Sequence, residues 1–302
     1  FHVDGQLLQK WEIPTRTENA GEAILSDIAA AILGKLEEQQ IDKADVHGIG
    51  IGIPAAVKDD GIVKKTSNLG WDYKEVKREL EEYTGLSVRT GNDANVAALG
   101  EMWRGGGTGY KNLIMITLGT GVGGGIVFDG KLIEGYKSAG AELGHITIRK
   151  GGIPCACGRK GCYEKYASAT ALISQTKHAM VDNPQSELWD LVEGKLENVD
   201  GRTVFIAARN GDETAKKVIE EYVGYLSEGI ADLVNIMRPE AIVLGGGVAN
   251  EGETLFEPLR KAVDERSYIA MDIVPLKIVG AKLGNRAGVY GAYCLAKERI
   301  DG

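Results

Sequence analysis

The chain has 302 residues, of which 43% are apolar and 26% are charged, so it is long enough for two domains of ordinary globular composition. Its net charge of −8 argues against a broad nucleic-acid-binding surface, and no apolar run approaches the roughly 20 residues that span a bilayer. The first residues have neither the basic nor the apolar region of a signal peptide. We therefore expect a cytoplasmic protein that binds neither nucleic acid nor membranes.

The first part of the chain is predicted to alternate strands and helices. Asp4-Gly5 is typical of a hairpin turn, and it predicts a strand at Gln6–Ile13 whose partner lies among about 20 residues upstream of Phe1. Apolar residues recur at helical spacing in Asn19–Gln40, and the strand pattern VHGIGIGI stops at Pro54. The predicted elements are helices over 19–40, 73–84 and 94–103 and strands over 46–53 and 86–90.

Glycine-rich residues 105–109 form the candidate linker to a second part of the chain. There the pattern predicts a tight glycine loop at Gly119–Gly125, a hairpin turn at Asp129-Gly130 and a mostly helical stretch from Ala167 to Met237. The other predicted elements are strands over 112–118, 125–128, 131–134, 241–244 and 272–279 and a helix over 287–299. Alternation of strands and helices indicates an α/β fold.

A histidine and three cysteines form the most informative pattern, EXXH-X9-CXC-X4-C-X-E. Three thiolates and one imidazole make a closed tetrahedral set that suits Zn2+, and a closed set indicates a structural ion. The alternative is a disulfide and a spare thiol, although a CXC pair rarely closes a good disulfide. Glu142 and Glu164 bracket the loop, so a bound metal can fix their spacing. The predicted metal ligands are His145, Cys155, Cys157 and Cys162.

The glycine loop after the 112–118 strand has five glycines in the seven positions 119–125. Such a turn leaves backbone N–H groups uncovered and favours anion binding. It lacks the Gly-Lys-Ser/Thr of a Walker loop, and a strand rather than a helix follows, unlike a dinucleotide-binding fingerprint. A glycine-rich hairpin without a ligand is the alternative. The turn at Gly245–Val248 is a weaker candidate for nucleotide contact, with a tight packing turn as its alternative.

Two further segments carry polar side chains suited to a sugar. Asp93, at a strand-to-helix junction, is a candidate general base, and Asn92 a candidate hydroxyl partner, although either residue could simply cap the helix. Asn68 lies in the segment SNLGWD, where an amide and the flat face of Trp71 would suit a sugar. A plain turn closed by Asn68 is the alternative there.

Together, the zinc pattern, NDAN and LGTGVGGG resemble the ROK family of sugar kinases and sugar-sensing repressors. The resemblance covers essentially the whole chain, and the signature GH-X9-CXCGXXGC-X-E is matched in full from Gly144 to Glu164. It implies an actin/hexokinase-like (ribonuclease H-like) α/β fold of two domains with a cleft between them. The small domain would comprise 1–107 and the C-terminal helix 287–302, and the large domain 108–286 with the zinc loop 142–164.

The bacterial ROK glucokinases are the most similar members, and they imply ATP-dependent phosphorylation of glucose at its 6-hydroxyl, the entry step of glycolysis. Asp93 matches the catalytic base, and Mg2+-ATP is the implied phosphoryl donor. The matching sugar partners are Asn68, Asn92, Asp93, Glu142, His145 and Glu164, with His145 also a zinc ligand. The second phosphate loop matches Gly119, Thr120, Gly121, Gly123 and Gly124, and the adenosine loop matches Gly245, Gly246, Gly247 and Val248.

The chain departs from the family at the first phosphate loop, Asp-X-Gly-Gly-Thr, which would lie just before Phe1. We therefore expect the intact protein to be catalytically active, and we expect the chain as written to be less active and less stable. Two alternative functions stay open: a kinase of another hexose or of an N-acetylated amino sugar, and a sugar-sensing transcription regulator. The resemblance also implies a homo-oligomer, either a dimer or a tetramer.

Overall fold

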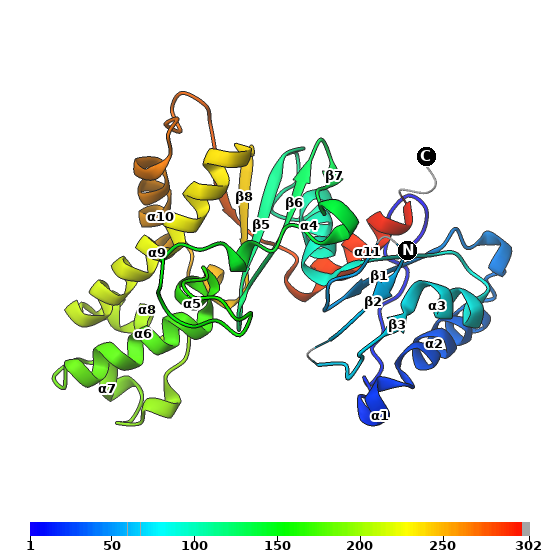
Figure 1. The fold of residues 1–302 in the computed structure, drawn as a ribbon, viewed down its shortest axis with the longest axis horizontal. Coiled ribbons are helices and arrows are strands. Elements are labelled where there is room, and N and C mark those ends of the chain that lie inside the picture. Colours follow the sequence, from blue (N-terminus) through cyan, green and yellow to red (C-terminus); the bar gives the residue numbers. More distant parts are fainter. Residues whose placement is uncertain (59, 67, 298–302) are drawn as a thin grey trace. The chain divides into compact units, whose positions relative to one another are not determined.

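The computed structural model describes residues 1–58, 60–66 and 68–297 (Figure 1). The chain divides into two compact units. The first unit comprises Phe1–Thr108, Leu132–Ala141 and the residues from Asn285 onward, and the second comprises Gly109–Lys131 and Glu142–Gly284. Within the described ranges, no helix is long and apolar enough to cross a membrane.

The first unit is built on two parallel strands, β1 (Ile49–Ile53) and β4 (Val88–Asn92), paired from Ile49 with Val88 to Ile53 with Asn92. A second, antiparallel pair joins β2 (Ile62–Val63) to β3 (Lys74–Glu75). The predicted helix over 19–40 is confirmed but divided into α1 (Glu18–Gly21) and α2 (Ile24–Glu38), and the predicted helix over 73–84 begins later, because β3 takes its first residues. The other helices are α3 (Val76–Thr84), α4 (Asp93–Arg104), α11 (Ala287–Lys297) and the short 3-10 turns η1 (Lys43–Asp45), η2 (Tyr136–Ser138) and η6 (Gly284–Arg286).

One apolar cluster fills the space between α2, α3 and the strands of the first unit. Its members come from the apolar stripe of each helix and from the inward positions of the strands, as the periodicity of the sequence predicts. The buried members are Ile24, Leu25, Ala29, Ile53, Val57, Val63, Trp71, Val76, Leu80 and Val88.

Helices α4 and α11 cross at unusually close range. A Cβ atom at Gly291 of α11 would overlap the backbone carbonyl of Val96 in α4, and one at Gly100 of α4 would overlap that of Ala287. Close packing of two helix backbones requires residues without side chains at the crossing. The C-terminal helix is therefore locked against the helix that begins at Asp93.

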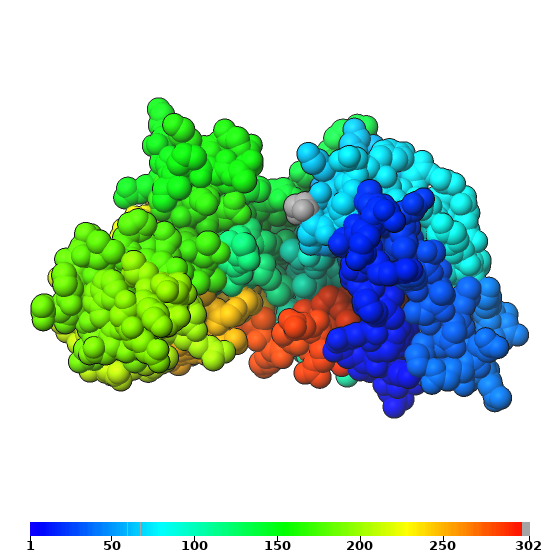
Figure 2. Space-filling view, turned by 90° about the horizontal axis from the view of Figure 1, so that it is seen from below, coloured from blue at the N-terminus to red at the C-terminus, as the bar shows by residue number. Residues whose placement is uncertain are grey.

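The predicted strand at Gln6–Ile13 is wrong. The turn at Asp4-Gly5 is present, closed by the N–H of Gly5 on the carbonyl of His2 at 2.9 Å, but no strand follows it within the described residues. A turn is followed by a strand only where a neighbouring strand accepts the backbone hydrogen bonds. Residues 6–13 are instead mostly exposed, and just before them the hydroxyl of Tyr293 in α11 donates to the carbonyl of Val3 at 2.9 Å, so the first residues lie beside α11 (Figure 2).

The second unit contains a five-stranded sheet in the order β7-β6-β5-β8-β9. Strands β5, β8 and β9 run parallel, and β6 is antiparallel to β5. The predicted turn at Asp129-Gly130 is confirmed, because both residues have left-handed φ values of 48° and 75°. The strands are β5 (Leu113–Leu118), β6 (Val122–Phe128), β7 (Lys131–Leu132), β8 (Ala241–Gly245) and β9 (Lys277–Gly280).

Helix α9 (Glu213–Met237) is the central helix of the second unit and contacts α5, α6, α8 and α10 (Figure 1). The predicted, mostly helical stretch over 167–237 is confirmed, whereas β9 is shorter than the predicted strand over 272–279. The remaining helices are α5 (Glu164–Ala167), α6 (Ala169–Asp182), α7 (Leu188–Leu191), α8 (Thr203–Asn210) and α10 (Glu253–Arg266), with 3-10 turns η3 (Leu143–His145), η4 (Leu196–Asn198) and η5 (Gly247–Glu251).

Candidate active site and metal-binding loop

Two glycine turns leave the same edge of the sheet in the second unit. Strands β5 and β8 are parallel neighbours with Thr117 opposite Gly245, so the turns that follow them lie side by side. Gly246 has a φ of +90°, and a Cβ there would overlap the carbonyl of Leu118 at the end of β5. The carboxyl ends of parallel strands are where α/β sheets bind ligands. The predicted phosphate and adenosine turns are therefore adjacent within this unit.

The turn after β5 is shorter than the predicted loop over 119–125. Leu118 pairs with Val122, so only residues 119–121 form the turn, while Gly123 and Gly124 lie in β6. Packing explains why residue 124 is a glycine, because a Cβ atom there would overlap both the carbonyl of Met115 and the side chain of Leu143. The turn is fixed at Gly119, whose carbonyl accepts from the N–H of Ala169 at the start of α6 at 2.9 Å. Phosphate binding by Gly123 and Gly124 stays a prediction.

The four predicted metal ligands come together. One nitrogen of His145 and the sulfur atoms of Cys155, Cys157 and Cys162 all lie within 4.8 Å of one another. The Cys155 sulfur is 3.8 Å from the His145 Nδ1 atom, and the Cys157 and Cys162 sulfurs are 3.6 Å apart. A tetrahedral ion with bonds of about 2.3 Å to sulfur needs ligand separations of about 3.8 Å. The donor set and its spacing fit Zn2+, and among the described residues no disulfide uses these thiols.

Backbone hydrogen bonds fold the loop around these ligands. Thr147 and Cys162 form one isolated bridge, and Pro154 and Lys160 form another. The guanidinium group of Arg159 donates to the carbonyl of His145 and, at 2.9 Å, to the hydroxyl of Thr147. Arg159 thereby fixes the backbone that carries the histidine ligand, a contact that the sequence pattern did not reveal.

Glu164 lies between the metal ligands and the glycine turn. Its Oε1 atom accepts from the thiol of Cys155 at 3.0 Å, and its Oε2 atom would be 2.7 Å from a Cβ at Gly121. The hydrogen bond to Glu164 and burial raise the pKa of Cys155 to about 12, so without a cation this thiol keeps its proton. Because Gly121 has no side chain, it leaves room for the Glu164 carboxylate, which is predicted from the sequence to bind the sugar.

Glu142 precedes η3 and His145 is its last residue, and this short helix packs against the start of β6. A Cβ at Gly144 would overlap the carbonyl of Val122, so this short helix lies directly against the strand that leaves the glycine turn. Glu142 is exposed and His145 is half-buried. The sequence-predicted residues of the second unit thus form one continuous group.

In the first unit, β4 delivers Asn92 and Asp93 to the start of α4. The Asn92 side chain accepts from the N–H groups of Ala94 and Asn95 at 3.0 and 3.2 Å and donates to the carbonyl of Ala55 at 3.1 Å. Asn92 is therefore the helix cap, which confirms the capping alternative for this residue. Asp93 is exposed as a residue, but partial burial of its carboxyl group raises its pKa, against the lowering by the N–H of Ala94.

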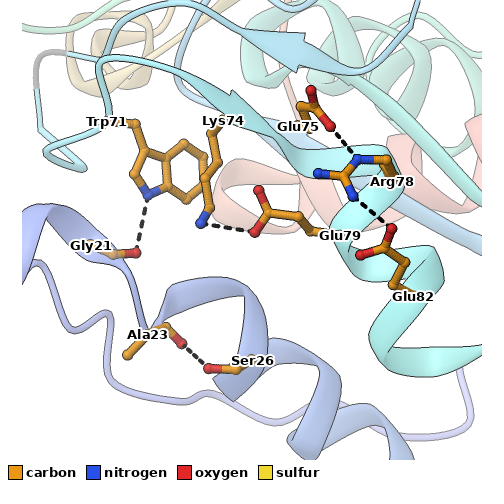
Figure 3. Close-up of polar contacts among 9 residues, drawn as sticks. All are labelled: Gly21, Ala23, Ser26, Trp71, Lys74, Glu75, Arg78, Glu79 and Glu82. Carbon is orange, nitrogen blue, oxygen red and sulfur yellow. Dashed lines mark hydrogen bonds and ion pairs between the residues drawn. The ribbon is translucent and has the colours of Figure 1, made fainter.

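Asn68 is exposed on the segment between β2 and β3, but Trp71 is not available to a ligand. Trp71 is only 4% exposed and belongs to the core, so the expectation that its flat face meets a sugar is wrong. Its indole N–H points at the carbonyl of Gly21 and donates to it at 3.1 Å (Figure 3). Nearby, Lys74 of β3 pairs with Glu79 of α3 at 2.9 Å (Figure 3).

Comparison with known proteins assigns the chain to a family. The profile of the ROK family matches residues 1–299. The chain belongs to the ROK family. A glucokinase of Halalkalibacterium halodurans is 41% identical over 298 residues, which cover 98% of the chain and 89% of that protein. A xylose repressor of Caldicellulosiruptor bescii is 35% identical over 281 residues, 89% of the chain and 68% of that protein.

A solved structure supports the fold. The crystal structure of a ROK family glucokinase from Streptomyces griseus, in complex with glucose and AMPPNP, matches the chain with a TM-score of 0.78 and 35% identity. The match covers 98% of the chain and 93% of that structure. The predicted actin/hexokinase-like α/β fold of the ROK family is therefore confirmed.

Proposed function

We propose that the protein is an ATP-dependent glucokinase that transfers the γ-phosphoryl group of ATP to the 6-hydroxyl of glucose. The observation that carries the proposal is the 41% identity with a glucokinase over 98% of the chain. The match to the xylose repressor covers less of both chains, which favours the kinase over the regulator. ATP and glucose are also the substrates that the ligands of the Streptomyces griseus structure represent.

The proposal assigns the proton transfer to Asp93. Its carboxylate accepts the proton of the 6-hydroxyl as that oxygen bonds to the γ-phosphorus, while the bond to the leaving ADP oxygen breaks. A carboxyl group whose pKa is raised by partial burial is a stronger base than an ordinary aspartate. Asn68 and Asn92 supply further hydroxyl partners, and Asn92 also fixes the start of the helix that carries the base.

Residues of the second unit are assigned to the other groups of the substrates. Glu142, His145 and Glu164 bind ring hydroxyls remote from the reacting one. The N–H groups of the 119–121 turn bind phosphate oxygens, and the turn at Gly245–Val248 contacts the adenosine. Mg2+ bound to the nucleotide phosphates neutralises their charge. A structural zinc, held by the four ligands described above, supplies rigidity rather than reaction chemistry.

The role of the metal is tested by Cys157→Ser. We expect the variant to lose zinc and to bind glucose at least about tenfold more weakly, because the metal-bound loop carries His145 and adjoins Glu164. Zinc content is measured by atomic absorption and glucose affinity by calorimetry. Cys294→Ser, on α11 and remote in sequence from the loop, is the control and should retain both. Loss of zinc with unchanged glucose affinity would disprove the structural role.

The substrate is tested by a coupled assay of ADP release with glucose, N-acetylglucosamine, N-acetylmannosamine and fructose side by side. We expect the highest kcat/KM with glucose. A higher value with an N-acetylated sugar would replace the proposed acceptor, and no ADP release with any sugar would favour a regulator. We further propose that the protein is a cytoplasmic homo-oligomer and that it catalyses the entry step of glycolysis. Residues 1–107 and 287–302 are proposed to form its small domain.

A further inference from the structure

The segment that carries Asn68 rests on a strained turn. Asn19, Ala20 and Gly21 have consecutive left-handed φ values of 50°, 56° and 64°. Each non-glycine residue in this conformation costs about 1–2 kcal/mol, so tertiary contacts must hold the turn in place. These three residues form the left-handed turn.

The left-handed turn lies directly against the Asn68 segment. A Cβ at Gly21 would overlap the carbonyl of Leu69, and a Cβ at Gly70 would lie 3.0 Å from the Cα of Ala20. Gly70 itself has a φ of +78°. Both backbones therefore approach to a distance that only glycine allows, and each limits the positions open to the other.

Trp71 takes part in three hydrogen bonds, one of which joins these two backbones. Its indole N–H donates to the carbonyl of Gly21 at 3.1 Å in the buried interior (Figure 3). Its backbone N–H donates to the hydroxyl of Thr66 at 3.0 Å, and its carbonyl accepts from the N–H of Thr66 at 2.8 Å. Thr66 and Trp71 thus close the segment from which Asn68 projects, and the indole fixes this closed segment to the left-handed turn.

We propose that Trp71 is a positioning residue for the acceptor sugar, acting through Asn68 without touching the sugar. The proposal rests on the proposed function, in which Asn68 binds a hydroxyl group of glucose. A buried indole with one hydrogen bond to a strained turn holds the segment in one place. Loss of that bond would release the segment and weaken sugar binding while the nucleotide turns, which lie in the second unit, keep their structure.

Trp71→Phe removes the indole N–H and keeps an aromatic ring in the core. Trp189→Phe is the matched control, because the Trp189 indole N–H also donates to a backbone carbonyl, that of Met180, at 3.0 Å in the second unit. Thr66→Val removes the hydroxyl that accepts from Trp71 with little change of shape, so it tests the proposal if Trp71→Phe folds poorly. Asn68→Ala removes the proposed sugar contact itself.

Initial rates with ATP and glucose varied in turn give kcat and both KM values for each variant. We expect Trp71→Phe, Thr66→Val and Asn68→Ala to raise KM for glucose about five- to tenfold, as the loss of one hydrogen bond allows, with kcat and KM for ATP changed less than about twofold. Trp189→Phe should lower the thermal midpoint about as much as Trp71→Phe but leave KM for glucose unchanged.

Other results overturn the proposal in distinguishable ways. If only Asn68→Ala raises KM for glucose, Trp71 does not position the segment and the proposed function stands. If Trp189→Phe raises KM for glucose as much as Trp71→Phe does, the effect is general destabilisation and the proposal falls. If Asn68→Ala has no effect, Asn68 is not a sugar contact, and the positioning role fails with it. Absence of glucose phosphorylation by the unaltered protein overturns the proposed function itself.

Discussion

Asp93→Asn should lower kcat for glucose phosphorylation by about 10²- to 10⁴-fold, because the amide cannot accept the proton of the 6-hydroxyl. KM for ATP and the dissociation constant for glucose should change little, since the amide keeps an acceptor oxygen for the N–H of Ala94. Steady-state kinetics and calorimetry with glucose separate these quantities. Unchanged turnover would remove Asp93 from the mechanism.

The pH profile provides an independent test of the same assignment. Because burial raises the pKa of Asp93, the active, ionised base is lost as the pH falls through a pKa that lies above the usual value for aspartate. The acidic limb of the kcat profile should disappear in Asp93→Asn. Asp42→Asn is the control, because Asp42 also accepts from a backbone N–H at a helix start, that of Ala44 at 2.9 Å, and has no assigned role.

Gly291→Val should reduce the free energy of unfolding by about 3 kcal/mol or more, because the new side chain overlaps the backbone of α4 and neither helix can yield without losing its packing. For a protein of this size the thermal midpoint should fall by roughly 6–12 °C. Calorimetry measures the midpoint, and kcat measured well below it shows whether the displaced α4 also moves Asp93.

Gly288→Val is the matched control for the helix crossing. It makes the same substitution in the same helix, but a Cβ at Gly288 has no neighbouring atom within 4 Å. The midpoint should therefore change by no more than about 3 °C, the effect of helix propensity alone. An equal loss of stability in both variants would show that the close approach to Val96 is not the cause.

Local pattern was sufficient to predict most elements and the metal cluster. Helical periodicity predicted α2, and local composition predicted α4 and the mostly helical stretch that contains α9. The spacing of one histidine and three cysteines predicted ligand atoms that the structure places within 4.8 Å of one another. These features depend on residues close in the sequence, where the geometry of a helix or a short loop decides which side chains meet.

The features that the sequence did not predict depend on contacts between distant residues. The segment SNLGWD predicts that the flat face of Trp71 meets a sugar, but the side chain is buried and its indole N–H donates to the carbonyl of Gly21, fifty residues earlier. Gly121 looked like a phosphate contact alone, until its position showed that it also makes room for Glu164. The turn at Asp4-Gly5 predicts a strand at Gln6–Ile13, but the segment does not pair as one. In each case tertiary packing, rather than propensity, decides the outcome.

The first unit is discontinuous in sequence, because α11 is added to a fold whose other elements mostly precede Gly109. A nascent chain therefore emerges from the ribosome with α4 uncovered along the face that Gly291 later occupies. The second unit, encoded between these pieces, can complete its sheet first, contrary to the usual order in which the N-terminal domain folds earliest. Until α11 is synthesised, the first unit is incompletely folded and exposes apolar surface. This is the interval in which chaperones would bind the nascent chain.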